Sequence, residues 1–376
     1  RKYKGPNTPP SAHPHLKTDT VMVMRGHKRG APLGHPGNNR PWLPDAPVNH
    51  IIATECPRCH SDDIRVPRTG RQQITNVPRE IQPETTTVER DYCECNKCHL
   101  KFVARDEQTP LKGRFGIDLM VLVIILRFIV RGVMRKTAGF LGASFSLRLA
   151  PASVQAIISR AAAAGTAEYE QLKERIRASD RLHVDETSFR VLGKNWWVWA
   201  FRSEQDKLLV IRKSRGNNVL EEILGEDYAG IVHCDCWRAY DYLKNAWLQR
   251  CWAHLLRKSA ELKESVAGRH FHKKLTALFN RIESFNKKER TPQEREKKYQ
   301  SLTKKLQALT KQYARYDDCK AVVKYIDFHI DSWFTCVRFD NVEPTNNLAE
   351  QAIRETVIVR KIIGAFRSEQ GPQNYE

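Results

Sequence analysis

The chain has 376 residues, of which 41% are apolar, so it can bury a core and form two or three domains, which excludes a single small module. Its formal net charge of +20 exceeds what solubility requires and indicates a polyanionic partner, with nucleic acid favoured over an acidic membrane surface. The ten cysteines, partly in metal-type pairs and without a secretory signal, predict a reducing, cytoplasmic location and exclude a disulfide scaffold. The longest apolar run, residues 119–126, is too short for a membrane span of about 20 residues and is interpreted as a buried helix.

Residues 1–50 combine proline, glycine, histidine and basic residues with hardly any hydrophobic periodicity. Such a composition does not bury enough apolar surface to fold, so the segment is predicted to be a flexible basic arm. Two interpretations stay open: an arm that contacts phosphates beside a folded domain, and an inert solvated tail.

Residues 51–106 contain two Cys-x-x-Cys pairs, Cys56/Cys59 and Cys95/Cys98. Four thiolates at this spacing fit one tetrahedral Zn²⁺, and a segment this small needs the metal for much of its folding energy. The prediction is a zinc ribbon with a β-hairpin between the pairs, against the alternative of unrelated buried cysteines. Cys93 is a substitute for Cys95 as the third ligand.

Residues 107–178 have helical periodicity and are predicted to form a helical DNA-binding region. A first helix would bury one face, a second would lie near 136–141, and a third would begin at Pro151. The apolar positions of the first helix are Ile117, Val121, Ile124, Ile125, Phe128 and Val133. Three short helices resemble a helix-turn-helix, and a plain helical linker is an equal alternative.

Residues 179–260 contain three β-rich runs, a helix that ends at Gly225, and two further short strands. Three strands followed by a helix and a strand is the order of a ribonuclease-H-like sheet, so this region is predicted to be the first part of a catalytic core. Residues 261–338 are wholly helical, with a cap and capping box at Thr291 and Glu294, and are predicted to be a helical insertion. Residues 339–376 would add the closing helix of the core. The predicted fold is thus a multidomain α+β protein.

Three carboxylates stand on these elements: Asp185 in the first strand, Asp235 in the fourth, and Glu350 early in the last helix. Phosphodiester chemistry uses two metal ions about 4 Å apart, and Mg²⁺ or Mn²⁺ prefers oxygen ligands. An aspartate among apolar strand neighbours is costly unless it is paired or binds metal, which makes Asp235 the most informative of the three. Among 43 acidic residues, the bare spacing by itself carries little information.

Two cations share the helix face of Glu350. Arg354 and Lys361 follow it at positions i+4 and i+11. They predict either phosphate contacts beside the metal site or a surface ladder of salt bridges, and the two interpretations are evenly balanced.

Four ordered motifs carry a resemblance to a known family: VDET at 184–187, DCWRAY at 235–240, CWAH at 251–254 followed by Arg257-Lys258, and NNLAEQAIR at 346–354 followed by Arg360-Lys361. Together with a GHPG element at 34–37 and the paired cysteines, they resemble the insertion-sequence-66 family of bacterial and archaeal transposases. The resemblance covers nearly the whole chain in the right order.

The resemblance implies a DDE transposase whose metal-binding triad is Asp185, Asp235 and Glu350. Water would free a 3′-hydroxyl at each end of the element, and that hydroxyl would attack target DNA. The implied partners are double-stranded DNA, as terminal inverted repeats and target, and further copies of the chain in a dimer or higher oligomer, in the nucleoid. The implied DNA contacts are Arg257, Lys258, Arg354, Arg360 and Lys361. The chain departs from the family at Thr345, where aspartate is usual, and at Cys236, where glycine is usual.

Other interpretations stay open. Cys234, Cys236, Cys251 and His254 would suit a second zinc site, although Cys251 and His254 are favoured as structural residues that brace the sheet. The alternative functions are a non-catalytic DNA-binding protein, either a repressor or a domesticated remnant, and a ribonuclease-H-like nuclease without joining activity.

Overall fold

The computed structural model describes residues 42–75, 81–106, 109–110 and 113–376, which fall into two compact units, Arg1–Gln82 and Pro83–Glu376. Most of the predicted basic arm, with its GHPG element, lies outside the described residues. In the first unit, the side chain of Gln73 both donates to and accepts from the backbone of Leu43, at 2.6 and 2.9 Å. Within the described ranges, no helix is long and apolar enough to cross a membrane.

The second unit begins with a two-stranded hairpin, β1 (Tyr92–Glu94) and β2 (Lys101–Val103), and four helices. The helices are α1 (Ile117–Ile124), continued by the π-helical turn η3 (Ile125–Ile129), α2 (Met134–Phe145), α3 (Pro151–Ala164) and α4 (Thr166–Arg177). The predicted helices, including the start at Pro151, are confirmed. Helices α1 to α3 share a core that contains Val123, Leu141, Val154, Ile157 and Ile158.

The buried face predicted for the first helix is wrong in part. Ile117, Val121 and Ile125 are exposed, whereas Val123 and Leu126 are buried. All residues of α1 except Asp118 are apolar, so the sequence does not single out one face. The π-helical turn then changes the residues per turn, so a pattern counted at 3.6 residues per turn loses phase.

A mixed sheet forms the centre of the second unit. Its strands are β3 (Arg181–Val191), β4 (Lys194–Arg202), β5 (Lys207–Arg212), β6 (Ile231–Cys234) and β7 (Trp247–Arg250). The order is β5-β4-β3-β6-β7, in which the first three strands pair antiparallel while β6 is parallel to both β3 and β7. A short strand, β8 (Ala365–Phe366), pairs with the far end of β3. The predicted succession of three strands, a helix and two strands is confirmed, with α5 (Asn218–Leu224) as that helix.

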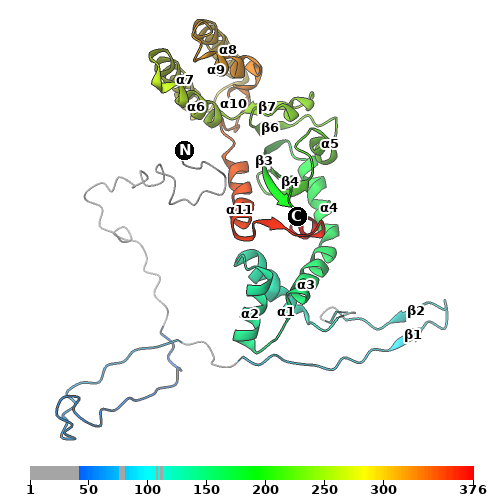
Figure 1. Cartoon of the computed structure of the whole chain (residues 1–376), viewed down its shortest axis with the longest axis vertical. Helices are drawn as coiled ribbons and strands as arrows, with labels where there is room; N and C mark the ends of the chain where they lie inside the picture. The colour runs from blue at the N-terminus through cyan, green and yellow to red at the C-terminus, as the bar shows by residue number, and fades with distance from the viewer. Residues whose placement is uncertain (1–41, 76–80, 107–108, 111–112) are drawn as a thin grey trace. The chain divides into compact units, whose positions relative to one another are not determined.

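Helices cover both faces of this sheet. On one face, Val184, Trp199 and Leu208 pack into a core with Leu220 of α5. On the other face, Ala200 packs against Ala352 and Ile353 of α11 (Asn347–Ile363). Figure 1 shows α11, in red, beside β3 and β4. The closing helix therefore brings the C-terminal part of the chain onto the first two strands.

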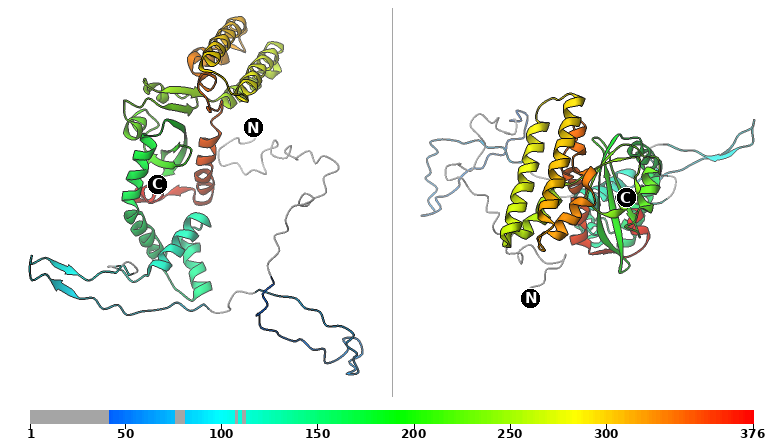
Figure 2. Two further views of the ribbon diagram at one scale, coloured as in Figure 1. Left: turned by 180° about the vertical axis from the view of Figure 1, so that it is seen from behind. Right: turned by 90° about the horizontal axis from the view of Figure 1, so that it is seen from above.

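The residues between β7 and α11 are mainly helical, and this helical insertion includes the predicted range 261–338 and begins earlier, with α6. Its elements are α6 (Trp252–Ala260), α7 (Val266–Asn286), α8 (Pro292–Tyr313), α9 (Lys320–Asp327) and α10 (Thr335–Arg338). The predicted capping box at Thr291 and Glu294 is confirmed. The helices run beside one another (Figure 2). Short helices η4 (Arg238–Tyr242), η5 (Glu261–Glu264), η6 (Ile330–Ser332) and α12 (Gln370–Gln373) complete the unit.

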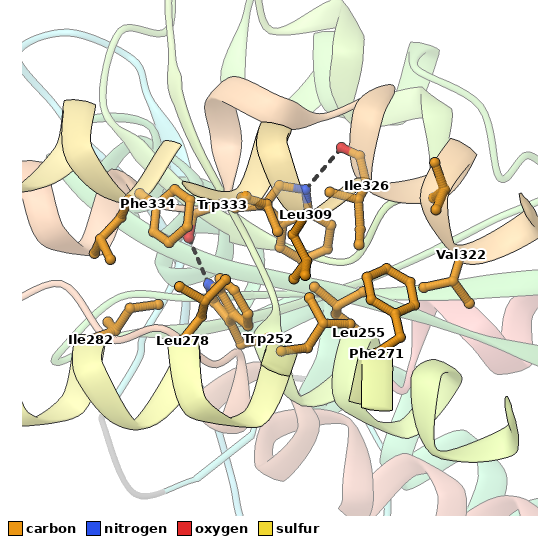
Figure 3. Close-up of a cluster of buried hydrophobic side chains, with 14 of the residues drawn as sticks. Trp252, Leu255, Phe271, Leu278, Ile282, Leu309, Val322, Ile326, Trp333 and Phe334 are labelled. Atoms are coloured by element: carbon orange, nitrogen blue, oxygen red, sulfur yellow. Dashed lines mark hydrogen bonds between the residues drawn. The ribbon is translucent and has the colours of Figure 1, made fainter. Parts of the chain in front are cut away.

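An aromatic core joins these helices and connects them to the sheet. The indole of Trp252 donates to the backbone oxygen of Trp333 at 2.6 Å, and the indole of Trp333 donates to that of Ile326 at 3.1 Å (Figure 3). Gln249 of β7 donates to the same Trp333 oxygen at 3.3 Å and accepts from the amide of Cys336 at 2.6 Å. Because these groups are buried and hydrogen-bonded, the insertion is fixed at the edge of the sheet.

Candidate active site

The two aspartates lie on neighbouring parallel strands. The register pairs His183 of β3 with His233 of β6, and Asp185 and Asp235 each lie two residues further on. Parallel strands are about 4.8 Å apart and residues i and i+2 share a face, so both carboxylates lie on the same face as the two histidines. Both aspartates are half-buried.

Glu350 reaches the site from α11, which covers that face. The backbone of Asn346, one residue before α11, accepts the amide of Glu350 at 3.2 Å. The buried side chain of Asn346 donates to the backbone oxygen of Val184 at 2.8 Å, and its Oδ1 lies 3.1 Å from Nδ1 of His183. Because the amide nitrogen already donates to Val184, Oδ1 must accept, which assigns the proton to Nδ1 of His183. Asn346 therefore connects the first turn of α11 to β3 beside Asp185.

The electrostatics of Asp185 place the three carboxylates in one neighbourhood. Burial raises the pKa of Asp185 to about 8, and the charges of Glu186, Asp235 and Glu350 act in the same direction. Oε1 of Glu350 is buried and has no hydrogen-bond partner among the described residues. A bound cation would relieve both the like charges that raise the pKa of Asp185 and the buried, unpartnered oxygen of Glu350.

The turn after β6 and the neighbouring strand β7 hold Asp235 in place. Its Oδ1 accepts the amide of Trp237 at 2.7 Å, which fixes the carboxylate in a tight turn after β6. The buried guanidinium of Arg250, at the end of β7, donates to the backbone oxygen of Asp235 and to Oδ1 of Asp241, both at 2.5 Å. Arg250 thus braces the loop that follows Asp235.

One buried carboxylate, that of Glu186, was not predicted from the sequence. Glu186 points to the opposite face of β3, where Nη2 of Arg215 lies 2.7 Å from its Oε1 and the hydroxyl of Tyr240 donates to Oε2 at 2.6 Å. The guanidinium of Arg215 stacks between Trp237 and Trp197, at 4.1 and 4.6 Å from the ring centroids. The adjacent acids of the VDET motif were the available signal for Glu186, whereas nothing local in the sequence singled out Arg215.

His183 and His233 form a stacked pair behind the aspartates, with ring centroids 3.8 Å apart. Burial lowers the pKa of His183 to about 4 and that of His233 to about 3. Both rings are therefore neutral at pH 7 and add no positive charge beside the carboxylates.

The predicted DNA-contact residues occupy different environments. Arg257, Lys258, Arg354 and Lys361 are exposed, and the ammonium of Lys258 lies 4.9 Å from the ring centroid of Tyr325. Arg360 instead donates to Oγ1 of Thr187 at 3.1 Å and to the backbone oxygen of Ser188. The guanidinium of Arg360 therefore attaches α11 to β3, which leaves the other four side chains as the accessible cations.

The two Cys-x-x-Cys segments have the same local conformation. In each, the first cysteine donates its amide to a residue five positions on, at 2.8 Å for Cys56 and 3.0 Å for Cys95. The histidine after each pair has positive φ and donates back to the first cysteine. Backbone amides of Arg58 and Cys59 lower the pKa of Cys56, and those of Cys98 and Lys97 lower the pKa of Cys95. These turns suit thiolates, the form in which cysteine binds zinc.

The four residues of the possible second zinc site, Cys234, Cys236, Cys251 and His254, do not all lie together. Cys234 is buried in the core on the α5 face, whereas Cys236 packs against the core of the helical insertion. In the part of the chain that the structure describes, one group has metal-ligand atoms that all lie within 4.8 Å of one another, and it consists of Cys251, His254 and Glu350. The structure therefore associates Cys251 and His254 with Glu350.

A family model described as Transposase IS66 family matches residues 112–374, which is more than half of the chain. No curated protein matches the chain. The matched region includes all three carboxylates, the helical insertion and α11.

Proposed function

Because the chain belongs to the IS66 transposase family, we propose that it cleaves DNA at the ends of its element and joins those ends to target DNA. The observation that carries the proposal is the convergence of Asp185, Asp235 and Glu350, from β3, the end of β6 and the start of α11, on one face of the sheet. The strand order, with three antiparallel strands followed by two parallel ones, supports a ribonuclease-H-like fold for this core.

The carboxylates fit a divalent cation. Their oxygens are the ligands that Mg²⁺ or Mn²⁺ prefers, and their mutual repulsion would be relieved by a bound cation. Two ions held there would polarise the scissile phosphate and stabilise the attacking and leaving oxygens. The protein would contribute orientation: Asn346 fixes Glu350 against β3, and Arg250 and the amide of Trp237 fix Asp235.

The other parts of the chain would hold DNA. Exposed Arg257, Lys258, Arg354 and Lys361 are proposed to contact phosphates near the carboxylates, in keeping with the net charge of +20. The helices α1 to α3 are proposed as a DNA-binding region, and the paired cysteines as the ligands of one structural Zn²⁺. A dimer or higher oligomer is proposed because two element ends must be processed together.

The test is Mg²⁺-dependent cleavage and strand joining on duplexes that carry the inverted repeats flanking the gene. Asp235→Asn should lower the rate by about 10³-fold, because the metal supplies several kcal/mol of transition-state stabilisation. Asp227→Asn, an exposed carboxylate after α5, is the matched control and should leave the rate unchanged. Equal rates for wild type and Asp235→Asn would refute the mechanism. Binding of the repeats without any cleavage by wild type would instead support the non-catalytic alternative.

A further inference from the structure

The first turns of α6 and α11 meet beside the proposed catalytic carboxylates. The amide of Trp252 donates to the backbone oxygen of Pro344 at 3.0 Å, and the amide of Asn346 donates to Sγ of Cys251 at 3.3 Å. Cys251 is the N-cap of α6, and Glu350 lies in the first turn of α11. Because helix N-termini carry partial positive charge, this junction favours a thiolate and a carboxylate.

Cys251 accepts from backbone amides at the same relative positions as do the first cysteines of the Cys-x-x-Cys pairs. Amides two and three residues on act on it, from Ala253 and His254, as the corresponding amides act on Cys56 and Cys95. Burial raises the pKa of the Cys251 thiol, and these amides oppose that effect. The Cys-x-x-His segment, at the start of α6, thus presents two backbone amides to its cysteine as the Cys-x-x-Cys turns do, with histidine in the place of the second cysteine.

The remaining ligand atoms lie within reach of a single ion. Nε2 of His254 is 3.8 Å from Oε1 of Glu350, while two ligands of a tetrahedral zinc with bonds of about 2.1 Å lie roughly 3.4 Å apart. Oε1 of Glu350 and Nδ1 of His254 are buried polar atoms without hydrogen-bond partners among the described residues. Small side-chain movements would therefore bring sulfur, nitrogen and oxygen onto one ion.

We propose that Cys251, His254 and Glu350 form a site for Zn²⁺, and that its occupation withdraws Glu350 from the magnesium centre. The thiol of Cys251 loses its proton to solvent on binding, and water fills the fourth position. A thiolate and an imidazole select Zn²⁺ over Mg²⁺, which prefers oxygen ligands. The binding site stands independently, whereas the withdrawal of Glu350 rests on the proposed function. This ligand set differs from the one considered from sequence, because Glu350 takes the place of Cys234 and Cys236.

The first experiment counts metal in the full-length chain. Metal-free protein is titrated with Co²⁺, and bound metal and the near-ultraviolet thiolate-to-cobalt absorption are measured per chain. Cys251→Ser should bind one ion fewer than wild type. Cys319→Ser is the matched control, because Cys319 is also a buried N-cap cysteine, of α9, and should bind as wild type does. Any ion held by Cys56, Cys59, Cys95 and Cys98 is common to all three proteins and cancels.

A second variant protects the test against misfolding of Cys251→Ser. His254→Ala changes a half-buried side chain and should weaken the same Co²⁺ site by about 10-fold or more, because loss of a direct ligand exceeds the loss of an outer one. Equal metal content in wild type, Cys251→Ser and His254→Ala would overturn the site. An equal loss of metal in Cys319→Ser would overturn it as well.

The second experiment measures displacement. Mn²⁺ bound to wild type is followed by electron paramagnetic resonance while Zn²⁺ is added, and one equivalent of Zn²⁺ beyond the structural ion should release Mn²⁺. Release that is equally efficient in His254→Ala would refute the withdrawal of Glu350. If Cys251→Ser loses one ion but wild type neither binds Mn²⁺ nor cuts DNA, the zinc site stands and the proposed function fails. If wild type cuts DNA and Cys251→Ser keeps all its metal, the function stands and the zinc site fails.

Discussion

Replacement of Asn346 by alanine tests whether this side chain holds the catalytic helix against the sheet. Asn346 is 1% exposed, and its amide bonds to the backbone oxygen of Val184 and to His183 at 2.8 and 3.1 Å. Loss of two such hydrogen bonds costs about 1 kcal/mol each, and the buried partners left behind add about 1–3 kcal/mol. The free energy of unfolding should therefore fall by roughly 3–5 kcal/mol.

The assay is urea-induced unfolding of the full chain, followed by tryptophan fluorescence at pH 7, together with Mn²⁺ binding. Asn347→Ala is the control, because Asn347 is the exposed neighbour at the first position of α11. The Asn346→Ala variant should also bind Mn²⁺ more weakly, since Glu350 loses its fixed position. A loss of stability no larger than that of Asn347→Ala would refute the role assigned to Asn346.

Three further predictions follow from the same structure. Because burial and neighbouring carboxylates raise the pKa of Asp185 to about 8, Mg²⁺ binding at pH 7 should release about 0.9 proton, and the affinity for Mg²⁺ should rise about tenfold from pH 6 to pH 7. Calorimetry in buffers of different ionisation enthalpy measures both the proton release and the affinity. Binding of Mg²⁺ that does not depend on pH would contradict the role assigned to Asp185. Arg215→Ala leaves the fully buried side chain of Glu186 without its ion-pair partner, so the free energy of chemical unfolding should fall by about 3–5 kcal/mol. Lys213→Ala, at an exposed neighbouring position, should change it little. Leu275→Ala in the core of the helical insertion should lower the free energy of unfolding by about 2–5 kcal/mol, whereas Lys273→Ala, at an exposed position, should change it very little. Equal unfolding midpoints for the two variants would show that this core does not contribute to the measured stability.

Local patterns in the sequence were sufficient for the order of the elements. Runs of β-forming residues predicted β3 to β5, and the cap at Thr291 with Pro292 and Glu294 predicted the start of α8, because these signals depend on neighbours in the chain. The same reasoning predicted α1 but was wrong for part of its buried face, because nearly all its residues are apolar and a π-helical turn then changes the residues per turn. The three carboxylates were predicted from their elements and from ordered motifs.

Contacts between distant segments were decided by the tertiary structure. Glu186 is a buried ion-pair partner only because Arg215 and Tyr240 pack against it, and Arg360 is attached to β3 only because α11 lies along that strand. Cys251 and His254 are three residues apart in sequence, yet their association with Glu350 depends on α11 returning to the start of α6 after the whole helical insertion. The sequence by itself therefore determined which residues could bind metal and the elements that carry them. Which of them share one ion depends on packing between elements far apart in the chain, and that only the folded structure decides.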